Sequence, residues 1–169
     1  FAEQKAEVVL LETGMGGRLD ATNVVTPILS IITDISRDHE QYLGNTLAAI
    51  AGEKAGIIKP GVPVVCSGRE ADALPVIVAR CLELGSPLTL FGRDFQGRAE
   101  NDGLDYTGVD RNHHRMPLAL RGAHQVVNTS LALAAVEVVR TVLPLTQDQI
   151  QTGLAQVSWP GRMELMEVA

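Results

Sequence analysis

The first half of the chain alternates short apolar runs with longer segments of helical periodicity. Runs with the length and β-branched composition of strands occur at 8–11, 28–33, 63–67 and 88–91. Helical spacing covers 46–58, where Asn45 or Thr46 can act as the N-cap, and 71–84, which Gly85 ends. This alternation with short connections predicts an α/β fold, a doubly wound and mostly parallel sheet flanked by helices.

The segment from Gly92 to about Arg121 has a weaker pattern, in which glycine, aspartate and asparagine dominate. Short β-like pieces within it favour a small antiparallel β excursion or a long loop. His113 and His114 lie in this segment beside two arginines. A solvated charged turn is the interpretation that we adopt for them.

Helical patterns return in the last third of the chain. The apolar spacing over 124–143 predicts a helix, and Thr146–Gln149 has the pattern of a capping box for a short helix at 150–157. Residues 1–6 have the pattern of the last turn of a helix, and residues 163–168 have that of a strand. Because neither end looks finished, we expect a fragment of a longer chain.

Composition narrows the class of protein. With 169 residues, 46% of them hydrophobic, the chain has enough apolar material for a packed core. Its formal charge of −6 and isoelectric point near 5.1 argue against a general nucleic-acid-binding surface. No apolar run reaches the roughly 18 to 20 residues of a membrane helix and no leader pattern is visible, so we expect a cytoplasmic protein. Cys66 and Cys81 lack the spacing of a zinc site and are predicted to be buried, reduced thiols.

Candidate chemistry begins where the first predicted strand ends. Glu12 follows the apolar run directly, and Gly14, Gly16 and Gly17 come within the next five residues. Open α/β sheets bind ligands at the carboxyl ends of their strands, which makes Glu12 the first candidate site residue. The spacing fits neither a dinucleotide fingerprint nor a GxxxxGK[ST] phosphate loop, and the glycines can equally form a tight connection.

The helix predicted at 46–58 contains an anomaly. Lys54 falls on the three- and four-residue spacing of the apolar residues, so its side chain leaves the helix along the apolar stripe. One interpretation is that its stem packs there while its ammonium group reaches solvent. The other is that a desolvated, neutral amine reacts with carbon dioxide to form a carbamate, an anion that is able to bind a metal.

Five motifs follow one another along the chain: ETGMGGRLDATN at 12–23, DHEQYLGNT at 38–46, EKAGIIK at 53–59, HQVVN at 124–128 and WPGR at 159–162. Together they resemble the folylpolyglutamate synthase and dihydrofolate synthase family, a branch of the Mur ligase superfamily. The first three are specific as an ordered set, whereas the last two are short. The resemblance covers nearly the whole chain and is poorest between residues 91 and 120.

The resemblance implies an enzyme that joins L-glutamate to a folate or to dihydropteroate, with ATP converting the acceptor carboxylate into an acyl phosphate. It implies ATP and Mg²⁺ as cofactors, and it assigns metal binding and catalysis to Glu12, His39 and a carbamylated Lys54. Histidine is an unusual ligand for Mg²⁺, so a structural role at the start of a helix stays open for His39.

The resemblance also assigns the substrate contacts. Asp20 and Ala21 would meet the pterin, whose aminopyrimidinone edge can donate two parallel hydrogen bonds to a carboxylate. Asn128, Arg162 and His124 would contact the nucleotide. Without the resemblance, Asp20 can equally be a turn or cap acid, Asn128 an ordinary helix residue and Arg162 a surface arginine.

The family pattern further implies a domain assignment. Residues 1–162 would be a partial central ATPase domain without its phosphate loop, and 163–169 would begin the link to a C-terminal domain. A chain of this extent is expected to be inactive by itself. Two alternatives stay open: another Mur-type amide ligase, and a non-catalytic nucleotide- or folate-binding fragment. Neither a nucleic acid nor a membrane is expected as a partner, and a monomer is the default.

Overall fold

The computed structural model describes residues 3, 5–100 and 103–159. Two of the sequence predictions, the strand at 163–168 and the nucleotide contact of Arg162, lie outside the described residues. The helix end predicted at 1–6 lies partly outside them, and its described residues form turns and irregular chain. No helix in the described ranges has the length and apolar content needed to cross a membrane.

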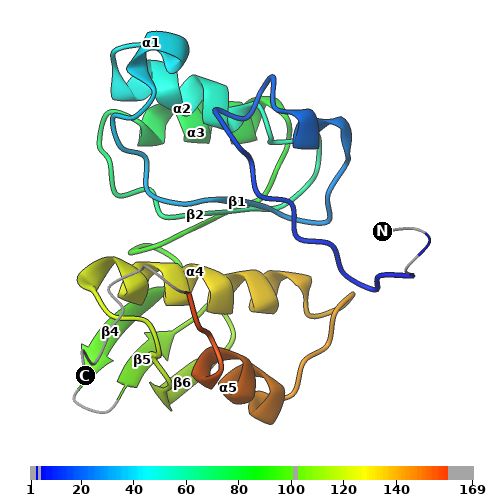
Figure 1. Cartoon of the computed structure of the whole chain (residues 1–169), viewed down its shortest axis with the longest axis vertical. Coiled ribbons are helices and arrows are strands. Elements are labelled where there is room, and N and C mark those ends of the chain that lie inside the picture. The colour runs from blue at the N-terminus through cyan, green and yellow to red at the C-terminus, as the bar shows by residue number, and fades with distance from the viewer. Residues whose placement is uncertain (1–2, 4, 101–102, 160–169) are drawn as a thin grey trace, which may run out of the picture.

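A three-stranded parallel sheet forms the centre of the first half of the chain. Its strands are β1 (Ser30–Ile32), β2 (Val64–Cys66) and β3 (Leu88–Leu90), in the order β1-β2-β3. Helices α2 (Leu47–Ala55) and α3 (Leu74–Glu83) connect the strands and cover one face of the sheet (Figure 1). The α/β fold predicted from the alternating pattern is therefore confirmed.

Local signals set the helix boundaries only in part. Thr46 is the N-cap of α2, and its Oγ1 accepts a hydrogen bond of 3.1 Å from the backbone N–H of Ala49. The helix ends at Ala55, earlier than predicted, where the C-cap Gly56 donates back to the last carbonyls. The sequence pattern did not predict the four-residue helix α1 (Glu40–Leu43), which is too short for a periodicity to be read.

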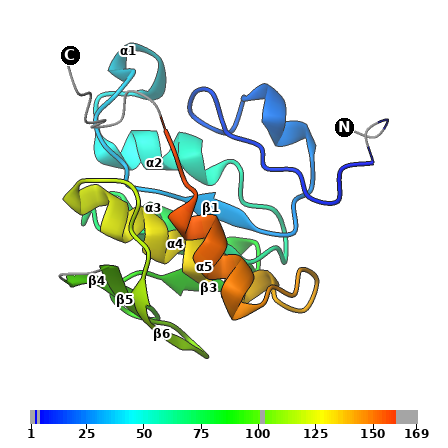
Figure 2. The same ribbon diagram turned by 60° about the horizontal axis from the view of Figure 1, so that its bottom comes forward.

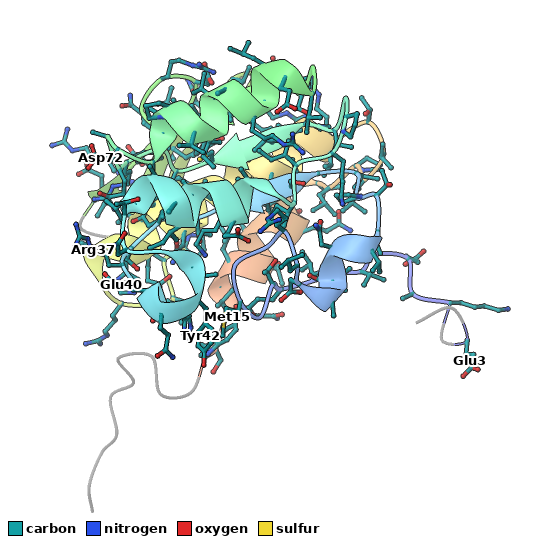
Figure 3. The ribbon with its side chains drawn as sticks, turned by 90° about the horizontal axis from the view of Figure 1, so that it is seen from above. Glu3, Met15, Arg37, Glu40, Tyr42 and Asp72 are labelled. Carbon is teal, nitrogen blue, oxygen red and sulfur yellow. The ribbon has the colours of Figure 1, made fainter. Side chains whose placement is uncertain are left out.

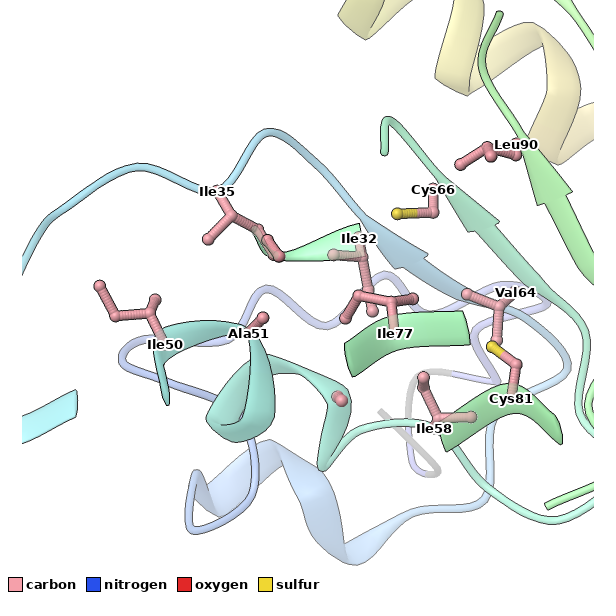
Figure 4. Close-up of a cluster of buried hydrophobic side chains, with 12 residues drawn as sticks. Ile32, Ile35, Ile50, Ala51, Ile58, Val64, Cys66, Ile77, Cys81 and Leu90 are labelled. Atoms are coloured by element: carbon pink, nitrogen blue, oxygen red, sulfur yellow. The ribbon is translucent and has the colours of Figure 1, made fainter. Parts of the chain in front are cut away.

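The central strand β2 shows why the sheet is buried on both faces. All three of its residues are buried. Val64 and Cys66 pack with α2 and α3 in one hydrophobic cluster (Figure 4), whereas Val65 belongs to a second cluster on the opposite face. Both cysteines are buried and free, as predicted, and burial raises the pKa of the Cys66 thiol to about 11.

Helix α4 (Ala123–Val139) lies against the second face of the parallel sheet and separates it from a smaller sheet (Figures 1 and 2). That sheet is antiparallel, in the order β4-β5-β6, which confirms the predicted β excursion. Its strands and the last helix are β4 (Gln96–Glu100), β5 (Gly103–Thr107), β6 (Asn112–Met116) and α5 (Gln147–Ala155). The predicted capping box is present at the start of α5.

A buried carboxylate ties the small sheet to α4. Glu137 accepts hydrogen bonds from the Tyr106 hydroxyl at 3.1 Å and from the backbone N–H groups of Val109 and Arg111 at 3.1 and 3.0 Å. Three donors compensate for removing this carboxylate from water. Burial, followed by the charge of Glu137, raises the pKa of Tyr106.

The interpretation of His113 as part of a solvated turn is wrong. His113 is 6% exposed, and its ring lies 5.9 Å from that of Tyr106, its partner across β5 and β6. His114 is exposed and lies 3.4 Å from Asp105. Successive residues of a strand face opposite sides, so the adjacent histidines have different environments.

The strand predicted at 8–11 is also absent. These residues are irregular and exposed, and Leu10 is 88% exposed. A strand exists only where a neighbour pairs with its backbone, and no described strand pairs with this segment. The apolar run alone could not supply that neighbour.

Replacing Gly97 by alanine should lower the free energy of unfolding by about 1–3 kcal/mol, because the added methyl group would collide with Ser130 Oγ where β4 packs on α4. Urea unfolding followed by circular dichroism measures the change. Gly52→Ala is the control, because nothing lies within 4 Å of the position that a Cβ atom would take there in α2. Its free energy of unfolding should rise by about 0.5–1 kcal/mol. Unchanged stability of the Gly97→Ala variant would contradict the close packing.

Candidate active site

The segment 12–20, here called the glycine loop, is folded around the carboxylate of Asp20. Asp20 Oδ2 accepts hydrogen bonds from the backbone N–H groups of Gly14 and Met15 at 2.9 and 3.1 Å. Asp20 Oδ1 accepts from the N–H and the hydroxyl of Thr22 at 2.9 and 2.6 Å, and Asp20 is thereby the N-cap of the short 3₁₀ helix η1 (Ala21–Val24). These bonds, led by the one from the Thr22 hydroxyl, lower the pKa of Asp20 to about 2.

The glycine loop is fastened to the C-terminal end of α2. The backbone N–H of Arg18 donates to the carbonyl of Glu53 at 2.8 Å. The Asn23 side chain donates to the carbonyls of Arg18 and Gly56, at 3.0 and 3.1 Å. The last carbonyls of a helix lack the usual donor four residues further on. The loop adds a donor to the carbonyl of Glu53, which also accepts from the N–H of Gly56, and another to the carbonyl of Gly56 itself.

The glycines permit a close backbone approach. A Cβ atom on Gly56 would collide with the Cα of Arg18, and one on Gly17 would lie 2.8 Å from the carbonyl oxygen of Glu53. Glycine is needed at both positions because the two backbones touch. The tight connection considered from the sequence is therefore observed.

Three of the sequence motifs meet at Gly16. This residue has a φ of +66°, and a Cβ atom on it would lie 2.9 Å from the Leu43 side chain of α1 and 3.7 Å from that of Glu53 in α2. Figure 3 shows Met15 of the glycine loop beside Tyr42 of α1. The motifs at 12–23, 38–46 and 53–59, separate in the sequence, thus form one contiguous region.

The predicted metal ligands lie on these three segments. Glu12 is exposed at the start of the glycine loop, His39 precedes α1, and Lys54 is half-buried in the last turn of α2. Among the described residues, no group of three His, Cys, Asp or Glu side chains is placed to hold a metal ion. The predicted site differs from such a group because one of its three ligands is a lysine. The joint metal binding of Glu12, His39 and Lys54 therefore stays a prediction.

The structure places His39 at the start of a helix, one of the two roles considered for it. It is the N-cap of α1, with a left-handed backbone at φ 52°, and its side chain makes no capping hydrogen bond. Its backbone N–H donates to Asp38 Oδ1 at 2.8 Å. The imidazole is therefore not engaged in holding the helix.

The residues predicted to contact a nucleotide are on the first turns of α4. His124 and Asn128 are exposed, and Gln125 lies between them in a short polar chain. The Asn128 side chain donates to Gln125 Oε1 at 3.2 Å, and Gln125 Nε2 lies 3.2 Å from His124 Nε2. Figures 1 and 2 place this end of α4 on the side of the molecule where α1 lies.

The sequence pattern did not single out Arg18 or Glu53. Arg18 Nη2 lies 2.8 Å from Glu53 Oε1, and Arg18 Nε lies 3.2 and 3.3 Å from the two carboxylate oxygens. Both residues stand inside quoted motifs, but 35 residues separate them. Pairing over that distance is decided by the fold.

A pocket of about 270 Å³ lies elsewhere, between α4, β6 and α5. Its lining combines apolar side chains such as Leu133, Val136 and Ile150 with Arg111 and Arg140. None of the predicted site residues lines it. The candidate active site is therefore the surface around the glycine loop and not this pocket.

Comparison with known proteins places the chain in a family. No family model matches it. It is 37% identical to the folylpolyglutamate synthase of Lacticaseibacillus casei, over 97% of this chain and 40% of that protein. It is 36% identical to the dihydrofolate synthase/folylpolyglutamate synthase of Bacillus subtilis, over 99% of this chain and 41% of that protein. The chain belongs to the folylpolyglutamate and dihydrofolate synthase family.

The structural similarity agrees. A solved complex of folylpolyglutamate synthase with AMPPCP and folate superimposes with a TM-score of 0.92 at 36% identity, over 99% of this chain and 42% of that one. The chain therefore spans about two fifths of the length of these relatives. The family's fold is present over this part.

The Asp20→Asn variant should loosen the glycine loop, because the amide NH₂ that replaces one carboxylate oxygen cannot accept hydrogen bonds. Hydrogen exchange should become faster at the Gly14 and Met15 amides and stay unchanged in α3. Asp72→Asn, a change at an exposed carboxylate outside the loop, is the control. Unchanged exchange at Gly14 and Met15 would contradict the role of Asp20 in folding the loop.

The same carboxylate gives a pH dependence. The pKa of Asp20 is lowered from 3.8 to about 2, so its stabilisation of the loop is complete above pH 3.8 and is lost as the pH falls through about 2. In an NMR titration, the Gly14 and Met15 amide shifts should therefore have a midpoint near pH 2. A midpoint near 3.8 would mean that the folded state does not favour the ionised carboxylate.

Proposed function

We propose that the protein containing this chain is an ATP-dependent ligase that joins L-glutamate to tetrahydrofolate and, as a second activity, to dihydropteroate. The relatives are named for these two synthase activities, and one solved relative is a complex with AMPPCP and folate. The observation that carries the proposal is the 36–37% identity over 97–99% of the chain, together with the contact of the three motifs at Gly16.

The proposed reaction has two steps. A carboxylate oxygen of the folate or pteroate attacks the γ-phosphorus of ATP, and ADP leaves as the acyl phosphate forms. The deprotonated amino group of glutamate then attacks the acyl carbon, a C–N bond forms, and inorganic phosphate leaves. Both steps bring anions together, so catalysis consists largely of positioning and charge stabilisation.

The residues of this chain fit the oxygen-rich binding of Mg²⁺ in part. Glu12 supplies an exposed carboxylate, and the Lys54 side chain is half-buried in the last turn of α2. Carbon dioxide can add to the neutral amine of Lys54, which loses a proton and gains two carbamate oxygens. We assign Mg²⁺ to Glu12, carbamylated Lys54 and His39, of which His39 has the least usual donor. The ion would neutralise phosphate charge.

We assign the pterin to Asp20 and Ala21. A carboxylate has about four lone-pair sites, and Asp20 already accepts four hydrogen bonds from its own loop. A pterin amine would therefore share acceptors with the loop. In this proposal Asp20 shapes the pterin site through the loop as well as by contact.

We assign the nucleotide to Asn128 and His124, with Arg162 as a phosphate contact beyond the described residues. Support comes from the exposure of the first two residues on one face of α4 and from the position of this end of the helix. We place the enzyme in the cytoplasm, where two buried, free thiols persist in the reduced state. A monomer stays a prediction.

The test is ligation by the full-length protein with ATP, Mg²⁺, glutamate and either tetrahydrofolate or dihydropteroate. The Lys54→Ala variant should lose about 10²–10³-fold in kcat, because it removes one of the three proposed ligands of the ion that would neutralise the phosphate charge. Lys5→Ala, at an exposed position outside the three motifs, is the matched control and should keep wild-type activity.

Two outcomes would overturn parts of the proposal. If the protein ligates a cell-wall nucleotide precursor but neither tetrahydrofolate nor dihydropteroate, it belongs to another branch of Mur-type ligases. Full folate ligation by the Lys54→Ala variant would remove the carbamate from the mechanism and leave the overall reaction intact.

A further inference from the structure

The side chains of Arg18 and Glu53 form a bidentate salt bridge between the glycine loop and α2. The guanidinium reaches the carboxylate through Nη2 at 2.8 Å and through Nε at 3.2 and 3.3 Å. The Glu53 carboxylate is the more buried partner, with 24% of its side chain exposed against 59% for Arg18. Arginine is suited to this geometry because its planar fork matches a carboxylate.

The same two residues are joined a second time, through their backbones. The N–H of Arg18 donates to the carbonyl of Glu53 at 2.8 Å. A single hydrogen bond would leave the loop able to rotate about it. A second, planar contact from the same residue to the same residue resists that rotation.

The position of the pair connects two groups of predicted site residues. Arg18 lies in the glycine loop between Glu12 and Asp20, and Glu53 directly precedes Lys54. Any change in the angle between loop and helix therefore moves Glu12 relative to Lys54. Glu53 points to a different side of the helix from Lys54, which leaves the lysine available for chemistry.

We propose that Arg18 and Glu53 are positioning residues that set the orientation of the glycine loop relative to Lys54. The inference rests on the proposed ligase function and deepens it, because it names the contact on which the relative placement of the metal-binding side chains depends. Neither residue touches the reacting atoms in this proposal.

Stability is a weaker explanation for the pair. Exposed ion pairs contribute little to folding because water screens them and ordering the side chains costs entropy. The end of α2 is already held by the Arg18 backbone and by the Asn23 side chain. Removing the side-chain pair should leave the loop attached but misoriented.

The experiment compares Arg18→Met and Glu53→Gln, two changes that keep much of the side-chain shape, in the full-length protein. Each should lower kcat about tenfold and raise the Mg²⁺ concentration for half-maximal activity about tenfold, as expected for residues that orient metal ligands. The KM values for glutamate and the pterin substrate should change less than about twofold, since neither substrate contacts the pair.

A readout independent of activity uses Mg²⁺ alone as the probe. In NMR titrations of the wild type, Mg²⁺ should shift the Gly14 and Met15 amide signals, and both variants should require about tenfold more Mg²⁺ for the same shift. Arg80→Met is the matched control. It removes an exposed arginine that pairs with Glu83 at 2.7 Å on α3, and it should change neither quantity.

Rescue separates positioning from a general loss of structure. Arg18→Lys keeps the charge without the fork and should recover only part of kcat. The double variant Arg18→Glu with Glu53→Arg should recover more than either single exchange does. No recovery in the double variant, or a kcat loss without a higher Mg²⁺ requirement, would overturn the inference.

The same experiments distinguish a failure of the proposed ligase function from a failure of the positioning role. If the wild type ligates no pterin substrate, the ligase proposal is wrong whatever the two variants do. If the wild type is active, Lys54→Ala is inactive and both pair variants behave as the wild type, only the positioning role is wrong.

Discussion

The close approach of the glycine loop to the C-terminal end of α2 is the constraint on which the candidate site depends. The backbones touch where Gly17 and Gly56 stand, and no side chain fits there. The loop donates hydrogen bonds to carbonyls at the end of the helix, so helix and loop stabilise each other. Asp20 completes this arrangement by closing the loop on itself. Together these contacts bring three distant motifs to one place on the surface.

Helix α4 has a comparable role for the architecture. It lies between the parallel sheet and the antiparallel sheet, and its buried residues include polar ones as well as apolar ones. Ser130 is fully buried beside Gly97 of β4, and Glu137 accepts three hydrogen bonds from the small sheet. The exposed first turns of the same helix carry His124 and Asn128. A helix fixed on both sides is a rigid support for the two residues that we propose to contact a nucleotide.

The carboxylates of the chain divide according to how their hydrogen-bonding capacity is used. Asp20 accepts four hydrogen bonds and Glu137 three from their own chain, so both carboxylates hold the fold together. Glu12 is exposed at the start of the glycine loop, which leaves it available for a cation. Glu53 lies between these cases, since it binds Arg18 and directly precedes Lys54. Asp20 and Glu53 thus hold the glycine loop in place, whereas Glu12 is free of that structural task.

The sequence by itself determined the elements that depend on local chemistry. The Thr46 cap and the capping box at Thr146 follow from side chains within a few residues. The alternation of apolar runs and helical spacing sufficed to predict the α/β fold, and the ordered motifs sufficed to indicate the family. Features that depend on distant partners were decided only by the tertiary structure. Residues 8–11 have the composition of a strand but no described neighbour, and His113 is buried because Tyr106 lies across from it. The Arg18–Glu53 pair spans 35 residues. Local sequence patterns indicate which backbone conformation a segment favours. Strand pairing and burial depend on which other segments of the chain lie beside it in the fold.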